Sequence, residues 1–116
     1  MSEQTPNYGN TERIPATLGA FSNLPCARRY TEGYEAPNPD QVKALIELSG
    51  LNRRQWAQLL GVTYSEKHGS TTLRKWTMKQ DAKDYRQIPY TTWRLMLIYM
   101  GIVDAIKDRE QLNLAG

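Results

Sequence analysis

Apolar residues recur at helical spacing from residue 42 onward. Val42, Leu45 and Ile46 belong to a mostly apolar stripe of the kind that one face of a helix buries. The four residues before this stripe, NPDQ, combine a capping asparagine, a proline suited to the first helical position and a glutamine that can complete a capping box. The pattern therefore predicts a helix that is capped by Asn38 and ends at Gly50.

The next segment predicts two short helices joined by a turn. Asn52 is a suitable cap for the first helix, which ends at Gly61, where the chain needs a left-handed turn. A polar stretch follows. We expect the second helix to begin near residues 69–71 and to run through Trp76 to about Met78.

Two further helices are expected near the carboxyl end. Residues 90–100 are dense in large apolar side chains and predict a largely buried helix. Residues 103–112 predict a last helix, with Val103, Ile106 and Leu112 turned toward a core or a partner. No segment shows convincing strand alternation. The pattern thus predicts an all-α fold of about five short helices with its three tryptophans in the core.

The amino-terminal third differs from the rest. Residues 1–37 hold four of the six prolines and show no helical or strand period. They predict an irregular arm with a short helix near residues 16–21, ahead of a helical domain over residues 38–116. Within the arm, Arg28 and Arg29 have two interpretations. They enter a DNA minor groove, or they pair with nearby glutamates while the arm wraps a dimer mate; the near balance of local charge favours the second.

Positive charge is concentrated in one part of the chain. The net charge is +3, and residues 1–37 carry three arginines against four glutamates. Nine basic side chains lie between Arg53 and Arg94, against three acidic ones. A polyanionic partner is one interpretation and an ordinary solvated face is the other. The position of the excess on and after the helix pair favours the polyanion.

Several kinds of chemistry find little support in the residue pattern. One cysteine, Cys26, and one histidine, His68, are too few for an ordinary zinc site, and a nucleophilic pair of the two lacks an oxyanion-hole signal. No phosphate-binding glycine loop or carboxylate pair is evident. We therefore expect no enzyme, no metal and no cofactor. No apolar run approaches the ~20 residues that span a bilayer, and the chain does not open on a secretory signal, so we expect a cytoplasmic protein with no membrane partner.

The helix pair carries the most specific motif. Helix-turn-helix units need a small residue where the helices cross, a glycine at the turn and apolar anchors on the second helix. Ala57 and Gly61 have the spacing Ala-x-x-x-Gly, and Leu73 and Trp76 are the anchors. With LNRRQWAQLLGVT, STTLRKWTM and IPYTTWRLMLIYMGI, the chain resembles lambda-repressor-like, or XRE-type, helix-turn-helix domains over about residues 38–103. The resemblance implies double-stranded DNA as partner, bound by a homodimer.

The resemblance also implies which residues read bases and which bind phosphates. The second helix of the pair would enter the major groove and the flanking basic residues would hold phosphates. The expected base-reading residues are Ser70, Thr71, Arg74 and Lys75. The expected phosphate-binding residues are Arg53, Arg54 and Gln55 at the start of the first helix, Lys67 and His68 in the loop, and Lys79 and Lys83 beyond the second helix. Thr72 either binds a phosphate or caps the second helix. For each residue the alternative is plain solvent exposure.

The turn departs from the usual pattern because it is too long. Between Gly61 and Leu73 the chain has several additional residues, approximately the stretch YSEKHG from Tyr64 to Gly69. Two interpretations stay open. The loop adds DNA contacts through its basic residues, or it is a surface insertion of the kind that loops tolerate.

The function implied by the resemblance is transcription regulation. We expect a repressor from a phage, plasmid or bacterial genome that binds an inverted-repeat operator and regulates its own operon. The alternative is an antitoxin or adaptor that also binds DNA and contacts a protein partner through the arm or the last helix. RNA binding through the same basic face is a weaker alternative.

Overall fold

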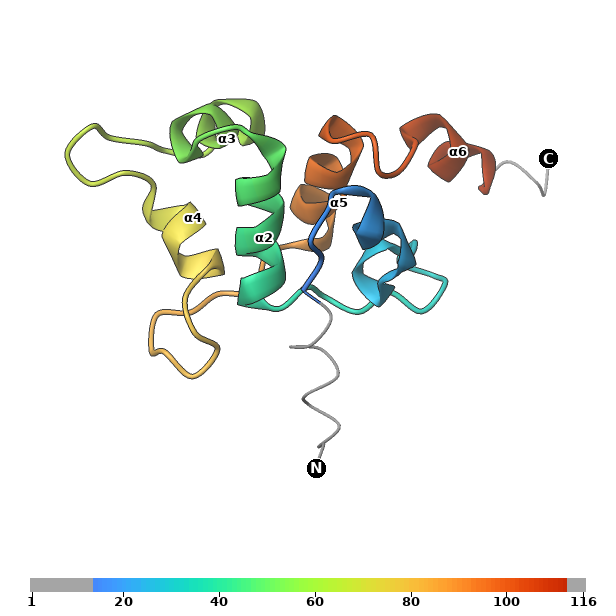
Figure 1. Ribbon diagram of the computed structural model, residues 1–116, viewed down its shortest axis with the longest axis horizontal. Helices are drawn as coiled ribbons and strands as arrows, with labels where there is room; N and C mark the ends of the chain where they lie inside the picture. Colours follow the sequence, from blue (N-terminus) through green and yellow to red (C-terminus); the bar gives the residue numbers. More distant parts are fainter. Residues whose placement is uncertain (1–13, 113–116) are drawn as a thin grey trace.

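The computed structural model describes residues 14–112, and every regular element in that range is helical, which confirms the predicted all-α fold. Five α-helices follow two short 3-10 helices (Figure 1). In chain order the elements are η1 (Gly19–Asn23), η2 (Pro25–Ala27), α2 (Pro39–Ser49), α3 (Arg53–Leu60), α4 (Thr71–Trp76), α5 (Tyr90–Tyr99) and α6 (Ala105–Glu110).

The first two α-helices begin as the sequence predicts. At α2 the Asn38 side chain accepts a 2.8 Å hydrogen bond from the Gln41 backbone N–H, and the Gln41 side chain accepts one of 2.9 Å from the Asn38 N–H. The same reciprocal capping box opens α3, between Asn52 and Gln55. These bonds satisfy backbone donors that a helix start leaves unpaired, so each start is fixed by local chemistry.

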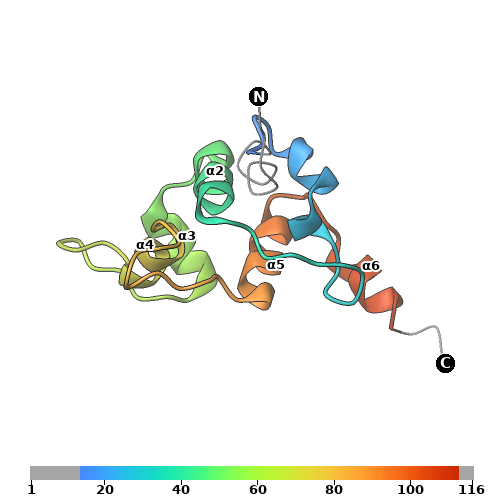
Figure 2. The same ribbon diagram turned by 90° about the horizontal axis from the view of Figure 1, so that it is seen from below.

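The helices form two groups on either side of α2 (Figures 1 and 2). In both views α3 and α4 lie on one side, whereas α5, α6 and the 3-10 helices lie on the other. One hydrophobic core joins the two groups and contains all three tryptophans, as predicted. Its fully buried members include Val42, Leu45, Trp56, Leu73, Ile88, Trp93, Met96 and Leu97.

Residues 14–37 contribute to this same core. Phe21, Leu24 and Cys26 are buried, and the Phe21 ring meets the Trp93 ring edge to face at 6.0 Å. The Trp93 indole N–H donates a 3.0 Å hydrogen bond to the Cys26 carbonyl. The short helix expected at residues 16–21 is instead η1, shifted toward the carboxyl end. The described part of the predicted arm is therefore packed on α5, while residues 1–13 of that arm lie outside the described residues.

Two helices end earlier or start later than predicted. α4 stops at Trp76. The Thr77 hydroxyl donates to the carbonyl oxygens of Leu73 and Arg74 at 3.1 Å and so competes for the acceptors that backbone N–H groups of a further helical turn would use. α6 starts after Asp104, whose carboxylate caps it. Of the residues expected to face a core or a partner, Val103 is half-buried against the core, whereas Ile106 and Leu112 are exposed and do not join it. Within residues 14–112 no helix has the length and apolar character needed to cross a bilayer.

Candidate nucleic-acid interface

α3 and α4 are the two helices that the sequence predicts as a helix-turn-helix pair, and several residues of the predicted motif occupy the expected positions. Ala57 is buried in the core, and Gly61 ends α3 in a left-handed conformation at φ 73°. The Val62 N–H returns to the Ala57 carbonyl at 3.0 Å and closes the helix end. On α4, Leu73 and Trp76 are buried, as the anchors of the motif should be.

α4 turns its remaining side chains outward to different degrees. Thr71 and Arg74 are exposed, and Thr72 and Lys75 are half-buried. The prediction that Ser70 faces outward is wrong. Ser70 is only 6% exposed, and its hydroxyl accepts a 3.2 Å hydrogen bond from the Leu73 backbone N–H. It is the cap of α4, so the alternative in which Thr72 caps the helix is wrong.

The start of α3 is close to both α4 and the loop between them. A guanidinium nitrogen of Arg53 lies 3.4 Å from the Thr77 hydroxyl, at the end of α4. Arg54 forms a 3.2 Å ion pair with Glu66, and both side chains are largely exposed. Gln55 is also exposed, but its side-chain oxygen is engaged in the capping box. Arg53 and Arg54 are thus accessible cations, while Gln55 has a structural task.

The additional residues between α3 and α4 form a small hairpin. Ser65 and Gly69 exchange backbone hydrogen bonds of 3.0 and 2.8 Å, and Gly69 takes a positive φ of 69°. The turn places Lys67 and His68 at the exposed tip. Both ribbon views show this hairpin projecting away from the body, on the side of α3 and α4 (Figures 1 and 2). Residues 62–69 are hereafter called the hairpin.

The connector after α4 folds back toward it. The Arg86 N–H donates a 3.2 Å hydrogen bond to the Lys75 carbonyl, and Ile88 is buried in the core. Lys79 and Lys83 are exposed on this connector, as are its acidic residues Asp81 and Asp84. The connector therefore brings additional cations to the side of the molecule that carries α3 and α4.

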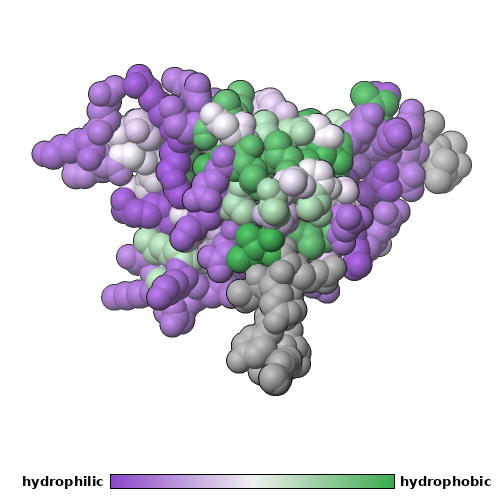
Figure 3. All heavy atoms as spheres, in the orientation of Figure 1, coloured by the Kyte–Doolittle hydropathy of each residue, from purple (hydrophilic) through white to green (hydrophobic). Residues whose placement is uncertain are grey.

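Eight cations on α3, the hairpin, α4 and the connector make up what we call the basic surface. The acidic residues of these four segments are Glu66, Asp81 and Asp84. The side of the molecule that carries the hairpin, α3 and α4 is strongly hydrophilic (Figure 3). Arg94, which the sequence interpretation counted with this excess, does not belong to it, because it is buried at 7% exposure in α5. The basic surface consists of Arg53, Arg54, Lys67, Arg74, Lys75, Lys79, Lys83 and Arg86.

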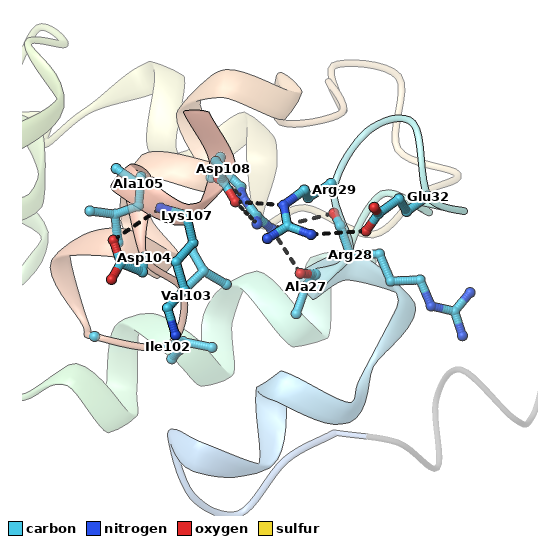
Figure 4. A pocket seen from close by; sticks show the side chains of 13 residues that line it. Ala27, Arg28, Arg29, Glu32, Ile102, Val103, Asp104, Ala105, Lys107 and Asp108 are labelled. Atoms are coloured by element: carbon cyan, nitrogen blue, oxygen red, sulfur yellow. Dashed lines mark hydrogen bonds and ion pairs between the residues drawn. The ribbon is translucent and has the colours of Figure 1, made fainter. Parts of the chain in front are cut away.

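Arg94 instead forms a charge cluster that the sequence interpretation missed. Its guanidinium makes two 2.8 Å hydrogen bonds to the Asp108 carboxylate and one of 2.7 Å to the Ala27 carbonyl. Arg29 reaches the same carboxylate at 3.1 Å and also pairs with Glu32 (Figure 4). The hydrogen bonds from Arg94 hold the pKa of Asp108 below its ordinary value, and Asp108 raises the pKa of Arg94.

The two arginines of the arm differ in their contacts. Arg29 is engaged with Asp108 and Glu32, and the Arg28 guanidinium lies 3.3 Å from the Gly33 carbonyl. The Arg29–Glu32 pair is the pairing with a nearby glutamate that one interpretation expects, whereas Arg28 is exposed and contacts a carbonyl. The one sequence signal for the cluster was an arginine inside the apolar run WRLMLI, where a buried cation requires a counter-charge.

The two residues considered for nucleophilic chemistry lie on different parts of the molecule. Cys26 is buried in η2 beneath α5, whereas His68 is exposed at the hairpin tip. Within residues 14–112 no group of three potential metal ligands comes together.

Comparison with models of protein families, with curated proteins and with solved structures found no match for this chain.

Proposed function

We propose that the protein is a sequence-specific, double-stranded DNA-binding regulator of transcription. The observation that carries the proposal is the form of α4. It is a six-residue helix whose Leu73 and Trp76 are buried while Thr71 and Arg74 are exposed and Lys75 is partly so. It lies within a surface of eight cations and three acidic residues. A short helix of this kind, anchored by two residues and otherwise polar, suits the major groove.

The proposed roles follow from side-chain chemistry and position. Arg74 and Lys75 read guanine through its O6 and N7 acceptors, and Thr71 contacts a thymine methyl or a base edge. Arg53 and Arg54, at the start of α3, and Lys79 and Lys83, on the connector, hold phosphates. These phosphate contacts supply affinity for any sequence, and α4 supplies the choice among sequences.

The proposed mechanism is steric repression. A homodimer binds an inverted repeat, one α4 to each half-site, and the bound dimer blocks RNA polymerase at its own promoter in the cytoplasm. Two-fold symmetry of the protein then appears as two-fold symmetry of the operator. Repression of its own operon makes the DNA just upstream of the gene the first sequence to test.

A gel-shift experiment tests the proposal directly. The purified protein is titrated into a duplex from the region upstream of its gene, at ~0.15 M salt with an excess of non-specific competitor. A discrete shift that resists competitor supports sequence-specific binding, and the symmetry of a footprint gives the stoichiometry. A shift that vanishes with competitor contradicts sequence-specific recognition of that region.

The second candidate is an antitoxin or adaptor that binds a protein as well as DNA. It is favoured by large apolar side chains that the described chain leaves exposed near the carboxyl end, Ile106 at 52% and Leu112 at 82%. Leu112 also lines an apolar hollow with Tyr30, Leu95 and Ile98, and an exposed apolar patch is a common contact surface. Light scattering on the purified protein separates the candidates: a dimer supports the homodimeric repressor, and a monomer that acquires a stable complex only with the product of a neighbouring gene supports the adaptor.

A further inference from the structure

We propose that the hairpin is a second DNA-contacting element, which grips the phosphodiester backbone beside the groove that α4 enters. The inference rests on the proposed function and deepens it, because it assigns a task to the segment that departs from the helix-turn-helix pattern. Its ligand is the phosphate backbone of a duplex, and its principal contact residue is Lys67.

The hairpin has a defined shape. Two backbone hydrogen bonds link Ser65 and Gly69, and the Ser65 hydroxyl accepts a third, of 2.9 Å, from the His68 N–H across the turn. Gly69 supplies the left-handed conformation that closes the turn. A turn held in this way presents the side chains of its tip at lower entropic cost than an unstructured loop of the same length.

Both ends of the hairpin are fixed to the proposed reading unit. Its first residue, Val62, is bonded to Ala57 of α3, and its last residue precedes Ser70, the cap of α4. A third link crosses the space between hairpin and helix, where Glu66 pairs with Arg54 at 3.2 Å. These links keep the hairpin beside the start of α3 and the cap of α4, so its tip lies next to the proposed reading unit.

The reach of the hairpin matches the dimensions of DNA. From Lys67 at the tip to Ser70 at the cap of α4 there are three residue steps, and extended chain advances ~3.3 Å per residue, so the tip lies up to ~10 Å from the start of α4. The major groove is ~12 Å wide. When α4 occupies the groove, a projection of that length from its amino end arrives at the strand that borders the groove.

The charges of the hairpin favour a phosphate. Its one acidic residue, Glu66, is paired with Arg54. Lys67 and His68 are exposed at the tip, and neither forms an ion pair with a carboxylate of residues 14–112. A cation on a fixed projection can neutralise one phosphate and release the counterions condensed there. A plain surface insertion needs neither the bridge to α3 nor a cationic tip.

The test is a salt titration of binding affinity. Wild type, Lys67→Ala and Lys67→Glu are compared by fluorescence anisotropy on a 30-base-pair duplex from the upstream region and on a scrambled duplex, between 50 and 300 mM salt. Loss of one phosphate contact reduces the slope of log K against log salt by about 0.9. We expect this reduction for Lys67→Ala, a three- to tenfold loss of affinity on both duplexes, and a larger loss for Lys67→Glu.

A matched control and a second variant keep the outcomes separate. Lys107→Ala removes one exposed cation from α6, on the other side of the molecule, and should leave slope and affinity unchanged. Unchanged slope and affinity in both Lys67 variants would overturn the hairpin inference, even if Arg74→Ala abolished discrimination and so upheld the proposed function. A third outcome is that wild type binds both duplexes equally and that Lys67→Ala reduces the salt slope. The hairpin inference then stands, and sequence-specific function fails for that region. Absence of any duplex binding by wild type overturns both.

Discussion

The Arg94 guanidinium and the Asp108 carboxylate form a two-pronged ion pair, with Nε–Oδ2 and Nη2–Oδ1 distances of 2.8 Å. The pair joins α5 to α6, and the remaining nitrogen of Arg94 bonds to the Ala27 carbonyl in the amino-terminal segment. Three segments far apart in the sequence therefore meet at one buried cation. Because a buried cation is costly without its counter-charge, the pair should control whether these segments stay together.

We predict that Asp108→Ala lowers the free energy of unfolding by about 3 kcal/mol, because it leaves the Arg94 guanidinium buried without a carboxylate. Urea unfolding followed by tryptophan fluorescence measures the effect, since Trp93 is adjacent to Arg94 in α5. Asp84→Ala, at an exposed position of the connector, is the matched control and should change stability by less than ~0.5 kcal/mol. Equal stabilities of the two variants would contradict the prediction.

The same pair predicts an acid dependence of stability. Arg94 holds the pKa of Asp108 below its ordinary value of 3.8, so Asp108 contributes stability above that value and loses it as the pH falls through the lower pKa of the folded state. We expect the difference in unfolding free energy between wild type and Asp108→Asn to be constant from pH 7 to about pH 5 and to shrink below about pH 4. Urea unfolding at each pH checks this. A difference that grows on acidification would show that the sign is wrong.

Phe21→Ala should cost about 3–5 kcal/mol, since Phe21 is fully buried against Trp93. A residue in a detached arm would give almost no change. Thermal unfolding of Phe21→Ala and of Tyr30→Ala, an exposed aromatic of the same segment, makes the comparison. A larger loss for Tyr30→Ala than for Phe21→Ala would contradict the burial on which the prediction depends.

The helix starts could be predicted from sequence because their determinants are local. Asn38 with Gln41 and Asn52 with Gln55 meet at three-residue spacing whatever the tertiary structure is. The tryptophans could also be assigned to the core, because their spacing within helices places them on apolar faces. The predicted base-reading residues were assigned less accurately. Ser70 is the cap of α4, and the long loop before α4 hides the start of this helix in the sequence.

The features that sequence reasoning missed depend on contacts between distant segments. Residues 14–37 lack periodicity, and their place in the core depends on contacts with α5, such as the hydrogen bond between residues 26 and 93, which no local pattern encodes. The partner of Arg94 lies in another helix, at position 108, beyond the reach of a local pattern. The hairpin was visible as surplus length, but its Ser65–Gly69 pairing was not, because no alternation of apolar and polar residues marks it.

Tyr34→Phe is expected to leave stability at pH 7 unchanged or to raise it by up to ~1 kcal/mol. The Tyr34 hydroxyl is buried and has no hydrogen-bond partner within the described range of the chain, so its removal relieves a desolvation cost. Burial raises the pKa of Tyr34 to about 12. Wild type should therefore lose stability between pH 10 and 12, where the unfolded phenol ionises first, and Tyr34→Phe should lose less. Unfolding at pH 7 and pH 11 checks both parts, and a marked loss at pH 7 would indicate a partner for the hydroxyl.

The proposed division between base reading and phosphate binding predicts two kinds of mutant. Arg74→Ala should lower affinity for the upstream duplex by about 1–3 kcal/mol and leave affinity for a scrambled duplex nearly unchanged, because a base contact is lost. Lys75→Ala should behave similarly. Arg53→Ala should weaken both duplexes alike and reduce the salt slope by about 1, since Arg53 is placed to bind phosphate.

Anisotropy titrations on the two duplexes separate these outcomes, and circular dichroism confirms that each variant is folded. All three side chains project from helices whose anchors are other residues, so the variants should retain wild-type helicity. If Arg74→Ala and Lys75→Ala both keep wild-type affinity for the upstream duplex, α4 does not read the bases of that sequence. If Arg53→Ala changes the preference between duplexes rather than the affinity for both, the start of α3 takes part in reading, and the boundary between the two roles moves from α4 to α3.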